Sequence, residues 1–183
     1  MEEQRVPIKP EEIKIEIIDR SHRVDLFQSY EQELVNFLRE DALENHKQRL
    51  SVTFLWFYEG MLVSYITLLN DKINLEGNLK EFFQEKGIHY KSLPALKIGR
   101  LCVDDRFQRR GLGKLMILTT IKIAHEISKT RSGCRFVTLD AKRNKNPERD
   151  PLLFYQKIGF QMLQGKKIDQ TSMYLDLQFI EEV

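Results

Sequence analysis

Two cysteines, four histidines and one tryptophan in a chain of 183 residues are too few for several kinds of site. Neither Cys102 nor Cys134 has a cysteine or histidine at the spacing of a zinc site or a redox pair, so we expect no metal. No apolar run is long enough to cross a bilayer, and no secretory signal is present. We therefore expect a cytoplasmic protein without a membrane span, in a reducing compartment.

An excess of charge of one sign is also missing. The 29 lysines and arginines oppose 27 acidic residues, and the net charge of +2 does not by itself indicate a nucleic-acid partner. The apolar fraction of 42% and the charged fraction of 31% are ordinary for a globular protein, and the length suits one core. We expect a flexible N-terminal segment over residues 1–12 and a single domain over residues 13–183.

Strand and helix patterns alternate along the chain. Strict alternation of Ile13, Ile15 and Ile17 predicts a first strand, and apolar residues at helical spacing predict long amphipathic helices. The expected elements are a strand at 13–17, a helix at 31–49, a hairpin at 51–58 and 61–69, a helix at 112–127, a strand at 136–139, a helix at 151–158 and closing strands at 160–163 and 173–177. This order predicts an α/β fold in which helices cover both faces of a mixed sheet.

The stretch from Asn70 to Ser92 has weaker patterns. Phe82 and Phe83 give residues 79–86 some helical character, and Pro94 should break the chain before the next strand. Two interpretations stay open: a short helix with a loop over an active-site cleft, or an insertion with no part in chemistry. We favour the first, because two adjacent phenylalanines need an apolar surface to cover.

The strongest functional pattern runs from Leu96 to Lys114. A strand-type run is followed by a turn with Gly111 and Gly113 and by the start of a long apolar helix. Backbone N–H groups at a helix N-terminus are unpaired and carry partial positive charge, and glycine lets an anion come close. These residues predict a pyrophosphate-binding loop. A Walker loop would need Ser or Thr in place of Leu115, and a dinucleotide fingerprint would need a third glycine in place of Met116.

The pattern Gln108-x-x-Gly111-x-Gly113 resembles the acetyl-CoA pyrophosphate loop of the GCN5-related N-acetyltransferases, the GNAT superfamily. The downstream run Phe154-Tyr155-x-x-x-Gly159-Phe160 strengthens the resemblance, although a plain glycine turn between strand and helix is an open alternative. The resemblance implies a mixed, mostly antiparallel sheet whose two middle strands splay apart in a V, with the pantetheine arm of the cofactor in the gap.

The resemblance also implies an activity: transfer of an acetyl group from acetyl-CoA to a primary amine by direct attack in a ternary complex. Tyr155 matches the usual acid that protonates the departing CoA thiolate. Cys102 lies near the implied oxyanion donor, but we expect a small apolar strand residue there and no nucleophile. The implied cofactor-binding residues are Leu101, Cys102, Val103, Gln108, Arg109, Arg110, Gly111, Leu112, Gly113 and Lys114.

Two parts of the implied site are incomplete. Many family members carry a cofactor-binding asparagine at the position of Glu148, so the loop from Lys142 to Asp150 would grip the cofactor differently, with Arg143 or Arg149 reaching its phosphates. No general base stands out. The candidates by residue type are Glu33, Glu40, Asp41 and Glu59, each of which is more often a solvated surface charge.

Within the superfamily, the run Gly99-Arg100-Leu101-x-Val103-Asp104 and the helix after Glu33 are similar to the acetyltransferase toxins of toxin–antitoxin pairs. These toxins acetylate the α-amine of aminoacyl-tRNA, so charged tRNA and an antitoxin become candidate partners. Another class of function is a non-catalytic CoA-binding module, and the chain is expected to be a monomer or a homodimer. The cations available for a phosphate-binding face are Arg100, Arg106, Arg109, Arg110, Arg131, Arg135, Lys142, Arg143, Lys145 and Arg149.

Overall fold

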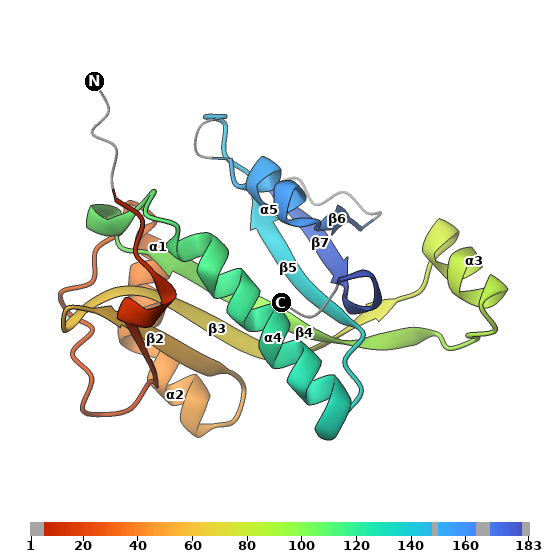
Figure 1. Cartoon of the computed structure of the whole chain (residues 1–183), viewed down its shortest axis with the longest axis horizontal. Coiled ribbons are helices and arrows are strands. Elements are labelled where there is room, and N and C mark those ends of the chain that lie inside the picture. The colour runs from red at the N-terminus through yellow and green to blue at the C-terminus, as the bar shows by residue number, and fades with distance from the viewer. Residues whose placement is uncertain (1–5, 148–149, 164–168, 181–183) are drawn as a thin grey trace. The chain divides into compact units, whose positions relative to one another are not determined.

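The strands of the computed structural model form one sheet in the order β1-β2-β3-β4-β5-β7-β6 (Figure 1). The structure describes residues 6–147, 150–163 and 169–180. The chain divides into two compact units, and β3 (Met61–Asn74), β4 (Ser92–Val103) and helix α4 (Leu112–Thr130) each contribute to both. Every pairing with a known register is antiparallel, so the mixed, mostly antiparallel sheet is confirmed, while the splay of its middle strands stays a prediction.

The first unit, which holds the chain up to Leu69 together with Ile98–Thr119, is built on a hairpin. Strand β1 (Ile13–Ile17) pairs with β2 (Val52–Tyr58), and β2 pairs with the first half of β3. The turn residues Glu59 and Gly60 have φ angles of 48° and 77°, the left-handed pair that fits the twist of a two-residue hairpin. The predicted hairpin is confirmed.

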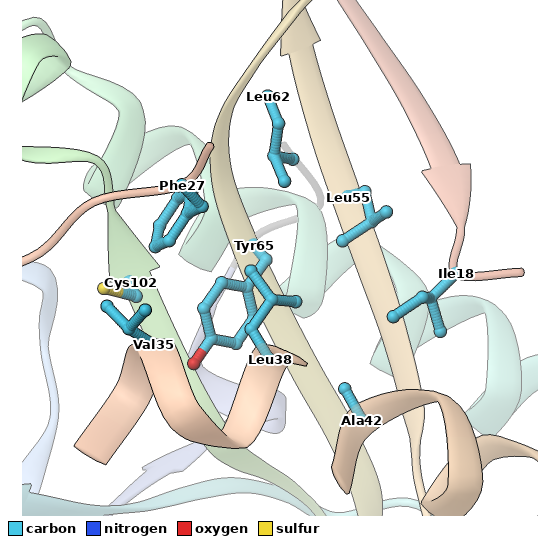
Figure 2. Packing of buried hydrophobic residues seen from close by; sticks show 9 residues of the cluster. All are labelled: Ile18, Phe27, Val35, Leu38, Ala42, Leu55, Leu62, Tyr65 and Cys102. Atoms are coloured by element: carbon cyan, nitrogen blue, oxygen red, sulfur yellow. The ribbon is translucent and has the colours of Figure 1, made fainter. Parts of the chain in front are cut away.

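The amphipathic helix expected at 31–49 is one helical stretch with a change of pitch. Helix α1 (Gln32–Asn36) continues as a π-helical turn, η2 (Phe37–Asp41), and then as α2 (Ala42–Lys47). Its apolar side buries Val35, Leu38 and Ala42 in the core of the first unit. Figure 2 shows these residues facing Tyr65 on β3 and Leu55 on β2, with Cys102 beside Val35; the other members of this core are Ile18, Phe27 and Leu62.

Three short segments complete the first unit: the 3-10 turns η1 (Pro10–Glu12) and η3 (Asp105–Phe107), and the first turns of α4. Residues 6–12 are in contact with the rest of this unit, since Ile8 is 5% exposed and its N–H donates to the carbonyl of Arg110 at 3.0 Å. Specific contacts thus hold residues 6–12, residues 1–5 lie outside the described part, and the domain boundary at residue 13 stays a prediction.

The second unit, which holds Asn70–Lys97 and the chain from Thr120 onward, contains the ends of β3 and α4 and the start of β4. Strand β5 (Phe136–Lys142) lies beside β7 (Gln170–Asp176), and β7 pairs in turn with β6 (Gln161–Met162) (Figure 1). Helix α5 (Leu152–Ile158) precedes β6, and the 3-10 turn η4 (Leu177–Phe179) follows β7. The helix and the strands predicted in this region are confirmed, with β5 running three residues further than expected.

The stretch from Asn70 to Ser92 corrects the prediction in two ways. Strand β3 continues to Asn74, and Pro94 lies inside β4 instead of breaking the chain before it. A proline is tolerated in a strand where its missing N–H is not needed, and the carbonyl of Pro94 still accepts from Arg135 N at 2.9 Å. Between the strands, helix α3 (Gly77–Glu85) confirms the weak helical pattern.

The two phenylalanines of α3 have apolar partners within the second unit. Phe83 is fully buried edge-on against Phe136, with ring centroids 5.9 Å apart, and Phe82 lies 6.4 Å from the ring of Phe179. Phe136 also meets Tyr174 edge-on at 5.6 Å. Burying such aromatic side chains stabilises the fold by about 2–3 kcal/mol each, so α3 contributes to the core of this unit.

Candidate functional site

The loop between η3 and α4 has the backbone shape expected of an anion-binding turn. Arg109 and Gly111 both have left-handed φ angles, of 62° and 85°. A Cβ atom added at Gly111 would meet no other atom within 4 Å, so the space over this glycine is open. Leu112, in contrast, is 1% exposed and anchors the start of the helix in the core. A ligand can therefore approach the backbone of Gly111 closely, while the helix behind it is held in place.

The first turn of α4 supplies the donors. The first N–H groups of a helix have no acceptor within it, and they lie here at the positive end of the dipole of a 19-residue helix. Arg109 and Lys114 are exposed beside this turn. Open glycine backbone, helix amides and two cations together suit a phosphate or diphosphate group.

Two other side chains of the predicted loop have partners inside the protein. Gln108 Nε2 donates to Asp105 Oδ1 at 2.7 Å. The Nε group of Arg110 donates to the carbonyl of Val6 at 2.9 Å, and its guanidinium lies 5.0 Å from the ring of Tyr58. The side chains of Gln108 and Arg110 therefore shape the loop. That these two residues bind the cofactor stays a prediction for their backbone groups.

The strand before the loop carries the three residues implied to pair with the cofactor. Leu101 and Val103 are partly exposed, whereas Cys102 is 5% exposed and lies in the core of the first unit. Burial raises the pKa of the Cys102 thiol to about 11, against the opposing effect of a hydrogen bond with Ser29. A thiol with that pKa is protonated at neutral pH, which agrees with the expectation that Cys102 is no nucleophile.

Arg100, two residues before Cys102 in β4, lies against the π-helical turn. Its guanidinium is 5.1 Å from the ring of Phe37, and that ring stacks on Tyr65 with centroids 6.4 Å apart. The hydroxyl of Tyr65 donates to the carbonyl of Leu34 at 2.8 Å, and burial raises the pKa of Tyr65. Tyr65 is therefore a structural residue whose hydroxyl proton is held in the hydrogen bond to Leu34.

Asp104 ends the strand and fixes the loop, a role that the sequence did not reveal. Its side chain is completely buried and accepts from the Arg106 guanidinium at 2.8 Å through each of its two oxygens. It also accepts from the backbone N–H of Gln28 at 2.9 Å. Although burial raises the pKa of Asp104, the hydrogen bonds from Arg106 and Gln28 outweigh it and hold the pKa below its ordinary value.

Tyr155, the implied acid, lies on α5 in the second unit. Its ring is 9% exposed and packs edge-on against Phe160 at 5.9 Å. Burial raises the pKa of Tyr155 to about 12, and within the described part of the chain its hydroxyl has no hydrogen-bond partner. Gly159, with a φ of 112°, ends α5 as predicted. The tyrosine therefore carries its proton at every physiological pH.

The loop before α5 is held by an ion pair. Arg143 Nε donates to Asp150 Oδ2 at 2.8 Å, and Asp150 Oδ1 accepts from the N–H of Leu152 at the start of the helix. Arg143 is thus occupied within the protein, which does not favour the hypothesis that it reaches a phosphate. Glu148 and Arg149 lie outside the described residues.

The candidate bases have no distinctive setting. All four are exposed to solvent: Glu33, Glu40, Asp41 and Glu59. Over the ranges that the structure describes, no three His, Cys, Asp or Glu side chains are grouped so that they could hold a metal ion. None of the helices in these ranges combines the length and apolar character needed to cross a bilayer.

Comparison with known proteins decides the family. Residues 49–162 match the acetyltransferase (GNAT) domain family. The chain belongs to this family. The class expected from the Gln108–Gly113 pattern is thereby confirmed: this GNAT protein is an N-acetyltransferase with acetyl-CoA as its donor. The matched region includes the loop at the start of α4, Cys102 and Tyr155, while no curated protein matches the sequence.

Solved structures support the same fold for this GNAT protein. AtaT complexed with acetyl-methionyl-tRNAfMet has a TM-score of 0.75 at 20% identity, over 91% of this chain and 95% of that one. AtaTR bound with AcCoA has a TM-score of 0.74 at 21% identity, over 92% and 95%. A tyrosine-to-phenylalanine mutant of KacT has a TM-score of 0.73 at 21% identity, over 91% and 96%. At these identities the likeness establishes the fold alone.

Proposed function

We propose that the backbone amides of residues 109–114 hold the pyrophosphate of acetyl-CoA, as the open, left-handed loop at the start of α4 suggests. The observation that carries the proposal is the unfilled space over Gly111 beside the N–H groups of the helix. Arg109 and Lys114, both exposed there, add positive charge. A diphosphate is the ligand that such a loop binds best.

We further propose that the backbone of Leu101, Cys102 and Val103 pairs with the pantetheine arm by strand addition. One edge of β4 is already paired with β3 just beyond these residues, since Asp104 N donates to the carbonyl of Val63 at 2.9 Å. A backbone N–H near Cys102 would then face the thioester oxygen as it gains negative charge. A preorganised donor of this kind lowers the barrier by about 3 kcal/mol.

In the proposed reaction an uncharged primary amine attacks the thioester carbonyl directly, in a complex that holds both substrates. The C–S bond breaks, and the proton of the Tyr155 hydroxyl passes to the sulfur of CoA. The raised pKa of Tyr155 means that the phenol still carries its proton when the leaving thiolate forms. The attacking nitrogen loses a proton to water, since none of the four exposed carboxylates has a setting that marks it as a base, and the Tyr155 phenolate takes a proton back from solvent.

For the acceptor we propose the α-amine of an aminoacyl-tRNA. The supporting observation is the likeness in fold to AtaT complexed with acetyl-methionyl-tRNAfMet over 91% of the chain. Arg100, which is half-buried, and Lys114, which is exposed, are cations of the first unit that form no ion pair with an acid in the described part of the chain.

A small-molecule or protein amine is the second candidate, and a specific observation favours it. At least three of the ten cations that could face a phosphate backbone form ion pairs in the described part of the chain, which lowers the positive charge left for RNA. These pairs are Arg106 with Asp104, Arg135 with Asp176 and Arg143 with Asp150. The low net charge of +2 points the same way.

The likeness in fold to the AtaT mutant toxin bound to the C-terminus of the antitoxin AtaR, with a TM-score of 0.71, supports an antitoxin as a protein partner. We also place the protein in the cytoplasm. Its two cysteines are both free and buried, as is common for proteins of a reducing compartment that supplies acetyl-CoA.

One assay separates these functions. The protein is incubated with acetyl-CoA and, in parallel, with aminoacyl-tRNA, uncharged tRNA, a protein lysate and a panel of small amines, while free CoA thiol and acetylated product are measured. The proposal expects product from aminoacyl-tRNA only, and a rate that falls as salt is raised. Acetylation of small amines alone would support the second candidate. Binding of CoA without turnover of any acceptor would support a non-catalytic module.

A further inference from the structure

The side chain of Arg110 is engaged in contacts within the protein. Its Nε group donates to the carbonyl of Val6 at 2.9 Å, across 104 positions of sequence. Its own carbonyl accepts from the N–H of Ile8 at 3.0 Å. Arg110 and the segment Val6–Ile8 therefore hold each other through a side-chain bond in one direction and a backbone bond in the other.

Two aromatic rings fix the guanidinium in this position. It lies 5.0 Å from the ring of Tyr58 and 5.7 Å from that of Phe107, and these rings meet edge-on at 6.3 Å. Ile8, in the segment bound by Arg110, is buried with 5% of its surface exposed. A planar guanidinium can stack on aromatic faces while its Nε group donates in the plane, which a lysine ammonium cannot do in the same geometry.

Arg110 lies between the two left-handed residues of the loop, Arg109 and Gly111. Left-handed backbone is unfavourable for an arginine, and it persists where the surroundings hold it. The bond from the Ile8 N–H to the Arg110 carbonyl fixes the peptide unit between Arg110 and Gly111, while the bond to Val6 fixes the side chain. This peptide unit leads directly into the helix amides at Leu112 and Gly113.

We infer that Arg110 is a positioning residue: it fastens the segment Val6–Ile8 to the loop and so keeps the loop in the shape that binds pyrophosphate. This inference rests on the proposed acetyl-CoA site. It differs from a direct role, in which the charge of Arg110 attracts the phosphates. In this role the segment Val6–Ile8 supports the cofactor site from behind the loop and does not itself contact the ligand.

The first test measures acetyl-CoA binding by titration calorimetry and the kinetic constants of the full chain. Arg110→Ala should raise Kd and KM for acetyl-CoA at least about fivefold and leave kcat within about twofold. Lys122→Ala, which removes one exposed charge on α4 outside the cations considered for phosphate binding, is the control for net charge and should change neither. Unchanged acetyl-CoA affinity in Arg110→Ala would overturn the inference.

A second position separates positioning from direct attraction. Tyr58→Ala removes the ring beneath the guanidinium but leaves the charge of Arg110 free to reach a phosphate, whereas Tyr58→Phe keeps the ring. The inference expects Tyr58→Ala to weaken acetyl-CoA binding as Arg110→Ala does, and Tyr58→Phe to bind like the wild type. Wild-type or tighter binding by Tyr58→Ala would show that Arg110 acts directly.

A third measurement needs no ligand. Amide hydrogen exchange of a peptide covering residues 109–114 should become at least about tenfold faster in Arg110→Ala and in Tyr58→Ala. Fluorescence of Trp56, the single tryptophan, checks that each variant is folded. If the wild type binds no acetyl-CoA, the proposed function fails, but the exchange rates still show whether Arg110 holds the loop in shape. Unchanged amide exchange in both variants would overturn the inference even if the protein binds acetyl-CoA.

Discussion

Arg106 forms a two-point ion pair with Asp104, the residue that ends β4. The Nε and Nη2 groups of the arginine lie 2.8 Å from Oδ1 and Oδ2 of a carboxylate that is completely buried. The same carboxylate accepts from the N–H of Gln28, which is 76 positions away. Asp104 thus joins the strand, the turn before the cofactor loop and the segment that leads into α1.

Replacing Asp104 with Asn should therefore destabilise the protein. The amide cannot accept from the guanidinium at both positions, and it leaves the half-exposed Arg106 without its buried counter-charge. We expect the free energy of unfolding to fall by about 3 kcal/mol, measured by urea denaturation followed through Trp56. Asp25→Asn is a matched control, since Asp25 pairs with Arg23 at the surface and its loss should cost less than about 1 kcal/mol. Equal effects of the two substitutions would contradict the central role of Asp104.

Because the pKa of Asp104 is lowered in the folded protein, the stabilisation that its carboxylate provides depends on pH. Because the folded pKa lies below the unfolded value, the unfolded chain binds the proton first as pH falls. The stabilisation is complete above about pH 4 and is lost as pH falls through the folded pKa. We expect the free energy of unfolding of the wild type to fall more steeply below pH 4 than that of Asp104→Asn.

Tyr155→Phe should slow turnover by at least about tenfold while acetyl-CoA binding stays within about twofold, because only the proton donor is lost. Steady-state acetylation and calorimetry measure the two quantities. Tyr90→Phe removes a hydroxyl from a side chain that is 72% exposed and should have no effect. A rate for Tyr155→Phe equal to that of the wild type would remove Tyr155 from the mechanism.

The pH profile offers an independent check on the same residue. With its pKa raised to about 12, Tyr155 keeps its proton throughout the neutral and mildly alkaline range. We expect kcat not to fall between pH 7 and 10 through loss of an acid. A fall in this range that disappears in Tyr155→Phe would show that the phenol ionises earlier than its burial indicates.

Gly111→Ala tests the open loop. Both Gly111 and Gly60 have left-handed φ angles with free space around the missing Cβ, so alanine should cost about 1 kcal/mol of stability at either position. Only Gly111→Ala should also weaken acetyl-CoA binding, by at least about tenfold, because its methyl group occupies the space left for the ligand. Equal binding by the two variants would place the pyrophosphate elsewhere.

Cys102→Ala should keep more than about a third of the wild-type rate. The thiol is buried and its pKa is raised to about 11, so it carries no negative charge to attack a thioester. We also expect the native protein to react slowly with a thiol reagent at pH 7, since both cysteines are buried. Complete loss of turnover in a folded Cys102→Ala protein would reopen covalent catalysis.

Much of the fold could be predicted from the sequence because its signals are local. Alternation over Ile13–Ile17, the Glu59-Gly60 turn and the apolar periodicity after Leu112 each depend on neighbours within a few residues. The loop pattern from Gln108 to Gly113 is local too, since the spacing of its glycines marks a backbone that an anion can approach. The family followed from these features.

Only the tertiary structure decided what each charged side chain does. Arg109 and Arg110 are adjacent and alike in sequence, yet Arg109 is exposed while Arg110 bonds to Val6 and lies against the ring of Tyr58. Arg143 lies in a loop that the family resemblance assigns to cofactor binding, but its side chain pairs with Asp150. The physical reason is that periodicity depends on neighbouring residues in the sequence. The partner of a long side chain, in contrast, depends on which distant segment lies next to it in the folded protein.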